Sequence, residues 1–138
     1  MEAALGQSAG KAGVHGSVWV GRVLSGLVVL ATAASGVMKL THAPAIVEGL
    51  VQHLGYSESA LTPIGIVEIA CGILYAIPKT RILGGLLLTA YLGGATASHV
   101  RVGEPFIAPV VLGIVVWVGL YLRDSAVRAL VPVVSSKS

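Results

Sequence analysis

The sequence predicts an all-α fold, an integral membrane four-helix bundle with a short interfacial helix between spans one and two. Hydrophobic residues make up 55% of the 138 residues and charged residues 11%, against roughly 25% charged residues in ordinary globular proteins. The mean hydropathy is +0.89. Four apolar segments approach the length of about 20 residues that a helix needs to cross a bilayer. None of these segments alternates polar and apolar residues as a membrane strand would.

The composition also excludes several classes of protein. A soluble domain of this size leaves about a third of its unfolded-chain surface exposed after folding. So few charged residues could not cover that surface, and this excludes an ordinary soluble globule, a disordered chain and a nucleic-acid binder. The single cysteine, Cys71, excludes an internal disulfide and a cysteine-based metal site. From this composition we expect the protein to contact the lipid bilayer and not to bind nucleic acid.

The first element is preceded by a tail. Residues 1–16 are rich in Gly, Ala and Ser and are expected to be a disordered N-terminal tail. The transmembrane domain is expected over 17–131, and a C-terminal tail over 132–138.

The four spans are predicted over Ser17–Leu40, Pro63–Ile77, Ile82–His99 and Phe106–Leu122. An alternative takes Arg22 and the apolar run after it as a cleavable signal peptide, although the apolar stretch continues to Lys39.

The segments that connect span one to span two and span two to span three carry recognisable sequence patterns. Between the first two spans, Pro44 to Leu54 places apolar residues at helical spacing and polar residues on the other side. This pattern, followed by Gly55, is typical of a short helix that lies in the membrane interface. The tight link around Pro78 makes spans two and three antiparallel neighbours.

The distribution of basic residues predicts an orientation. With four spans, both termini lie on one side of the membrane, and that side carries seven Lys and Arg residues: Lys11, Arg22, Lys79, Arg81, Arg123, Arg128 and Lys137. The other side carries Lys39 and Arg101. This imbalance predicts a protein of the plasma (inner) membrane with both termini in the cytoplasm.

Polar residues within the spans are the candidates for a functional site, because an ionisable group there is costly without a partner or a purpose. Glu68 is flanked on its helical face by Gly65 and Gly72, small residues that let another helix approach, so it is expected to point into the bundle. Burial disfavours the charged form of such a carboxyl group unless a cation compensates.

The candidate partners of Glu68 share the predicted outer half of the bundle. Glu68 and His99 are the candidate catalytic acid/base pair. The candidate binding residues are Lys39, Arg101, Glu104 and Thr96. Such a pocket would hold a polar head group, for example a quinone carbonyl or an anion.

Structural explanations of the same residues stay open. Lys39 and Arg101 would serve equally as anchors that reach the interface. Glu68 paired with Lys39 or His99 would be an interhelical clamp, and His99 would simply end its span by bonding a carbonyl. The chain has no CxxC motif for thiol chemistry, no HExxH motif for zinc, and too few histidines within its spans for a bis-histidine haem. No particular cofactor or metal is predicted.

Read together, the segments resemble the DoxX-like family of small bacterial four-helix membrane proteins, over roughly Val20 to Leu130. The resemblance rests on RVLSGLVVL and SGVMKL in the first span, on LGYSESALTPIGIVEIACGILYAIPKTRILGGLLLTAYLGGATASHVRVGEP through the next two, and on GLYLRD after the fourth. It implies the four-helix membrane fold. The family takes its name from relatives attached to a thiosulfate:quinone oxidoreductase, and other relatives accompany redox-defence proteins.

The polar residues and the resemblance lead to two alternative hypotheses about function. In the first, the polar pocket binds or acts on an apolar small molecule, a quinone or isoprenoid, in redox-linked metabolism. In the second, the chain is a non-enzymatic subunit that docks a redox-enzyme partner or another copy of itself, and the polar cluster is a clamp. The sequence leaves open whether the protein is an enzyme.

Overall fold

The computed structural model describes the backbone of residues 2–131 and, except at 2–12 and 14, their side chains. The described residues hold helices and turns but no strand, so the predicted all-α class is confirmed. The elements are α1 (Glu2–Leu40), α2 (Pro44–Ile46), the π-helix η1 (Val47–His53), the 3₁₀ helix η2 (Glu58–Ala60), α3 (Leu61–Ala76), α4 (Arg81–Val102), α5 (Ile107–Arg123) and α6 (Ser125–Leu130).

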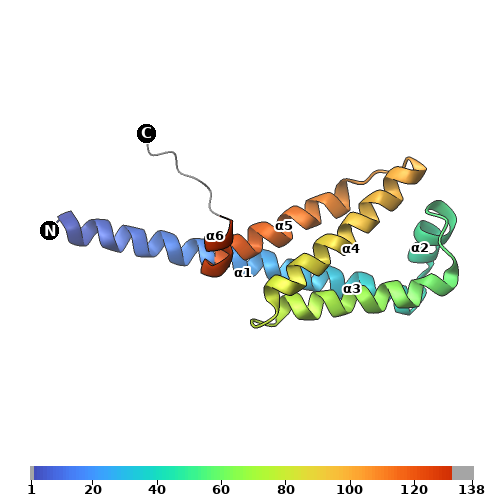
Figure 1. Ribbon diagram of the computed structural model, residues 1–138, viewed down its shortest axis with the longest axis horizontal. Helices are drawn as coiled ribbons and strands as arrows, with labels where there is room; N and C mark the ends of the chain where they lie inside the picture. Colours follow the sequence, from blue (N-terminus) through green and yellow to red (C-terminus); the bar gives the residue numbers. More distant parts are fainter. Residues whose placement is uncertain (1, 132–138) are drawn as a thin grey trace.

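Four long helices pack around one core (Figure 1). Helix α1 packs against α3 and α5, and α4 packs against the same two helices. The short turn at 77–80 makes α3 and α4 antiparallel neighbours, as predicted. Helix α2 lies at the end of the molecule away from α6 (Figure 1). Two ends of the bundle are thereby distinguished, the α2 end and the α6 end.

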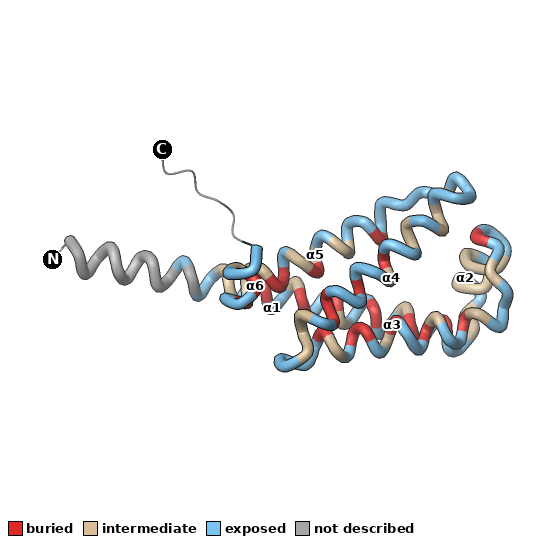
Figure 2. The backbone as a smooth tube through the Cα atoms, viewed as in Figure 1, coloured by how far each residue is buried: buried red, intermediate tan, exposed pale blue. Residues whose placement is uncertain are grey.

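Apolar side chains lie both inside and outside this arrangement. The interior contains Val28, Tyr75, Leu88, Val116 and Leu120, each fully buried (Figure 2). The outer faces of all four long helices expose large apolar residues, an unusual surface for a protein in water. Two helices, over His15–Leu40 and Glu58–Ala76, are long and apolar enough to cross a membrane. Helix α5 is apolar but shorter.

Glycines set the closest approaches between helices. A Cβ atom at Gly84 of α4 would lie 2.2 Å from the backbone nitrogen of Tyr75 on α3. A Cβ atom at Gly65 of α3 would lie 2.9 Å from the carbonyl oxygen of Gly36 on α1. Both contacts are to backbone, which cannot move aside as a flexible side chain does. Packing of these helices therefore requires the smallest residue at these positions.

The N-terminal region differs from the expectation. Helix α1 begins at Glu2, whereas the sequence predicted a disordered tail over 1–16. The physical reason is that helix extension adds one hydrogen bond for each residue ordered, so a long helix propagates cheaply into adjacent good helix formers such as Ala and Leu. The predicted C-terminal tail at 132–138 lies outside the described residues.

The segment after α1 is helical, as its spacing predicted, but most of it has π-helical geometry. Its apolar positions face the protein: Leu54 is buried, and Leu50 and Val51 are half-buried. Its polar residues Glu48 and Gln52 are exposed. Gly55 follows with a φ of 76°, the left-handed conformation that favours glycine. Its position in a membrane interface stays a prediction.

Candidate functional site

A buried ion pair joins α1 to α3. Lys39 Nζ donates to Glu68 Oε2 over 2.7 Å, and the two side chains are only 7% and 5% exposed. Lys39 also donates to Ser35 Oγ, one turn earlier on α1, at 2.6 Å. The expectation that Glu68 points inward is thus confirmed. Each charge has lost its water and gained a charged partner, the condition under which buried ions are tolerated.

The glycines beside this pair explain how it forms. Gly36 and Gly65 bring the backbones of α1 and α3 together one turn from the two charged residues, and a Cβ at Gly65 would also meet Lys39 Cβ at 3.0 Å. Further along the same interface, a Cβ at Gly72 would lie 2.5 Å from Thr32 Oγ1. The small face that the sequence indicated around Glu68 is therefore the contact face with α1.

Tyrosines complete the polar site, and sequence reasoning missed them. Tyr91 of α4 interacts electrostatically with Glu68 and, more weakly, with Tyr56. The Tyr56 hydroxyl is 2.6 Å from Ser98 Oγ on α4. A tyrosine within an apolar helix is equally typical of packing, so only its position relative to Glu68 distinguishes it.

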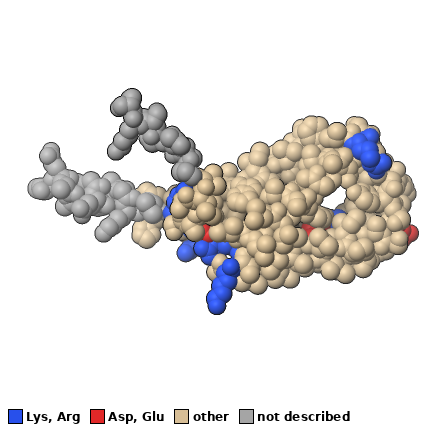
Figure 3. Space-filling view, in the orientation of Figure 1, with Lys and Arg blue, Asp and Glu red and all other residues tan. Residues whose placement is uncertain are grey.

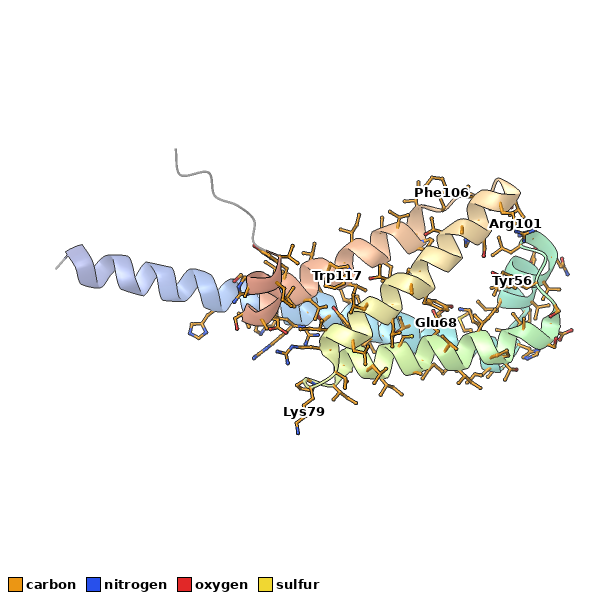
Figure 4. All side chains as sticks on the ribbon, in the orientation of Figure 1. Tyr56, Glu68, Lys79, Arg101, Phe106 and Trp117 are labelled. Carbon is orange, nitrogen blue, oxygen red and sulfur yellow. The ribbon has the colours of Figure 1, made fainter. Side chains whose placement is uncertain are left out.

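This polar site lies beside an opening in the molecule. Figure 3 shows the opening between the far part of α4, α2, and the pair α1 and α3. Figure 4 shows Glu68 on α3, with Tyr56 and Arg101 nearer the α2 end. The polar groups of this site are a carboxylate, an ammonium group and phenolic hydroxyls. These groups can donate to and accept from a carbonyl or hydroxyl oxygen.

Two other predicted residues of α4, His99 and Thr96, form hydrogen bonds within their own helix. His99 Nδ1 lies 2.8 Å from the carbonyl oxygen of Ala95, within its own helix. Among the described residues, no hydrogen bond or ion pair joins His99 to Glu68 or Lys39. Thr96 donates to Leu92 O at 2.8 Å and faces α5, where it lines a groove of about 470 Å³ with Thr89, Gly113 and Trp117. The acid/base role of Glu68 and His99 stays a prediction.

Arg101 and Glu104 are at the end of α4. A terminal nitrogen of Arg101 donates to the carbonyl oxygen of Leu54, which ties the segment after η1 to α4. Gly103, with a φ of 74°, ends the helix, and the backbone N–H of Glu104 donates to His99 O at 3.0 Å. This is a Schellman ending. Arg101 therefore connects the segment after η1 to the end of α4, and the backbone N–H of Glu104 completes the helix ending.

A second cluster of polar residues lies at the α6 end, and the sequence analysis did not predict it. Arg81 of α4 pairs with the buried Asp124, the residue before α6. The Asp124 side chain also accepts from the N–H of Ala126 at 2.9 Å and so caps α6. The hydrogen bond from Arg81 lowers the pKa of Asp124 from its ordinary value, against the opposite effect of burial. An Asp after an apolar run resembles a solvated loop residue, so sequence alone could not single it out.

No three His, Cys, Asp or Glu side chains of the described part of the chain gather as a metal site requires. The comparison with protein families is informative: the model described as the DoxX-like family matches residues 23–119, more than half of the chain. The chain belongs to the DoxX-like family. The predicted resemblance is thus confirmed. Comparisons with curated proteins and with solved structures gave no match.

DoxX-like membership and the two long apolar helices together indicate a small membrane protein that contacts the lipid bilayer. The matched region contains Lys39, Glu68 and Tyr91, so the polar site lies within the family domain. Asp124 and α6 follow after it.

Proposed function

We propose that this DoxX-like protein crosses the bilayer four times, with both termini in the cytoplasm, and binds the head of an apolar small molecule between its helices. The ligand would be a quinone or isoprenoid in redox-linked metabolism, entering from the lipid. The four outer faces with exposed large apolar residues support the four spans. The excess of Lys and Arg at the α6 end supports the orientation.

The observation that carries the binding function is the juxtaposition of Glu68, Lys39 and Tyr91 beside the opening of Figure 3. Ligand sites are mostly apolar cavities with a few convergent polar groups that fix orientation. Here the polar groups come from three different helices, and apolar residues surround them. A quinone carbonyl would accept from the Tyr91 hydroxyl or the Lys39 ammonium group, and its ring and tail would lie against the apolar walls.

The test is quinone binding to the purified chain in detergent, with a short-chain isoprenoid benzoquinone as the probe. Tyr91→Phe removes one hydroxyl and should weaken binding about tenfold, the effect of losing one hydrogen bond to a charged or polar partner. Tyr121→Phe is the matched control, since Tyr121 lies at the α6 end, and it should bind as the wild type does. Equal binding by the wild type and Tyr91→Phe, or no binding by the wild type, would contradict the pocket.

The clamp is the second candidate, favoured by the 2.7 Å distance and near-complete burial of the Lys39–Glu68 pair. If the pair only locks α1 to α3, then Lys39→Met should lower the free energy of unfolding by about 3–5 kcal/mol, because it strands a buried charge. The double variant Lys39→Met/Glu68→Leu should recover most of that loss. Recovered stability without any change in quinone binding would favour the clamp and a partner-docking subunit over the pocket.

A further inference from the structure

A separate cavity lies at the opposite end of the bundle from the Lys39–Glu68 pair. It has a volume of about 200 Å³, between α1, α3 and α5. Its lining residues are Arg22, Ser25, Gly26, Val29, Tyr75, Ala76 and Arg123. The wall is apolar except for two arginines and two hydroxyls. None of these residues takes part in the function proposed above.

The two arginines share this cavity because their helices meet there. A Cβ atom at Gly21 would lie 2.8 Å from the backbone nitrogen of Arg123, so α1 and α5 touch at this level. Two guanidinium groups beside one cavity repel each other unless an anion lies between them. Among the residues whose side chains are described, the one carboxylate at this end is Asp124, which pairs with Arg81. The other acids with described side chains belong to the α2 half: Glu48, Glu58, Glu68 and Glu104.

The hydrogen-bond donors of the cavity that have no acceptor within the described structure belong to guanidinium groups. Tyr75 donates its hydroxyl to Val116 O at 2.9 Å, so in the 3.0 Å contact between Ser25 and Tyr75 it is Ser25 that donates. Arg123 donates one terminal nitrogen to Tyr75 O at 3.3 Å and keeps a buried Nε with no acceptor. Arg22 is exposed and, within the described structure, has no carboxylate partner. Planar guanidinium groups match the oxygens of phosphate better than any neutral ligand.

We propose that this cavity binds a phosphate group, either the headgroup phosphate of an anionic lipid or free phosphate. Basic residues gather at this end of the molecule (Figure 3). Basic pockets between membrane helices on the cytoplasmic side are suited to anionic headgroups. Gly26, Val29 and Ala76 add apolar lining to the cavity, against which the lipid portion that follows the phosphate would lie. The site is independent of the proposed quinone pocket.

The experiment measures binding of phosphatidylglycerol to the full chain in detergent by native mass spectrometry, with phosphatidylcholine as the zwitterionic reference. Arg22→Gln should weaken phosphatidylglycerol binding about tenfold, because it removes one charged donor. Gly26→Val should do the same without any change of charge, because a side chain there enters open space beside the cavity. Lys79→Gln is the matched control, since Lys79 is exposed and points away from the body (Figure 4).

A parallel thermal-unfolding series with inorganic phosphate separates the two sources. Stabilisation of the wild type by inorganic phosphate, lost in Arg22→Gln, identifies free phosphate; response to phosphatidylglycerol alone identifies the lipid. Arg22 is exposed and Gly26 has open space where its Cβ would be, so both variants should fold, and their melting temperatures verify this. The site is refuted if both variants bind as the wild type does, or if Lys79→Gln weakens binding equally.

Discussion

The two buried acids with described side chains, Glu68 and Asp124, each have a basic partner from a different helix. A buried charge without a partner costs several kcal/mol, so each acid specifies one helix–helix contact. For Glu68 this follows from the sequence, because an acid within an apolar span requires a partner. For Asp124 it does not, because the residue follows an apolar run, and only the folded structure shows that its side chain is buried.

The first prediction concerns Asp124 and pH. Because its pKa is lowered in the folded state, its ion pair stabilises the fold fully above the unfolded value of about 3.9. That contribution should be lost as the pH falls from there through the folded pKa. Asp124→Asn keeps a capping side chain for α6 but loses the charge. It should lower stability at pH 7 by about 2 kcal/mol.

The measurement is the melting temperature in detergent from pH 7 to pH 3. The difference between wild type and Asp124→Asn should be largest near neutrality and shrink below about pH 4. Glu58→Gln is the control, since Glu58 is an exposed carboxylate whose ion pair with His42, at 3.2 Å, lies at the surface. A constant difference across the whole range would show that Asp124 acts through shape rather than charge.

At the scale of the helices, glycine position decides which faces meet. The chain has 18 glycines, and the helical ones look alike in the sequence. In the structure, Gly84 lies against the backbone of α3, whereas Gly94, on the same helix, has open space where its Cβ would be. Small residues permit close approach, but only the tertiary structure shows which glycines are used.

The second prediction uses that contrast. Gly84→Ala should destabilise the protein by about 1–3 kcal/mol or more, because a single methyl group would force α3 and α4 apart. Gly94→Ala makes the same chemical change on the same helix and should be neutral or slightly stabilising, because alanine is the better helix former. Thermal unfolding of both variants in detergent measures the effect. Equal melting temperatures would mean that α3 and α4 do not pack at Gly84.

At the scale of the whole molecule, the two ends of the bundle have different chemistry. The α2 end holds the Lys39–Glu68 pair, the opening and the bond from Arg101 to Leu54. The α6 end holds most of the basic residues and the Arg81–Asp124 pair. A bilayer with different surfaces on its two sides would orient such a molecule in one direction.

The third prediction is that orientation. In a Cys71→Ser background, a cysteine at Ser57, exposed at the α2 end, should react with a membrane-impermeant thiol reagent added to intact cells. A cysteine at Lys79, exposed in the turn between α3 and α4, should react only after the membrane is opened. Labelling of Lys79→Cys but not Ser57→Cys in intact cells would show that the orientation is the reverse of the one proposed. Labelling of both would show that the turn at Lys79 is not cytoplasmic.

The sequence by itself determined the helical class, the DoxX-like family, the antiparallel pair α3–α4 and the inward position of Glu68. These follow from local information, since apolar length, punctuation by proline and the cost of a buried charge are readable along the chain. The tertiary structure alone decided that Lys39 is the partner of Glu68, that His99 bonds its own helix, and that Tyr91 joins the site. Those choices depend on the rotation of each helix about its axis, which distant glycine contacts set and which no local pattern specifies.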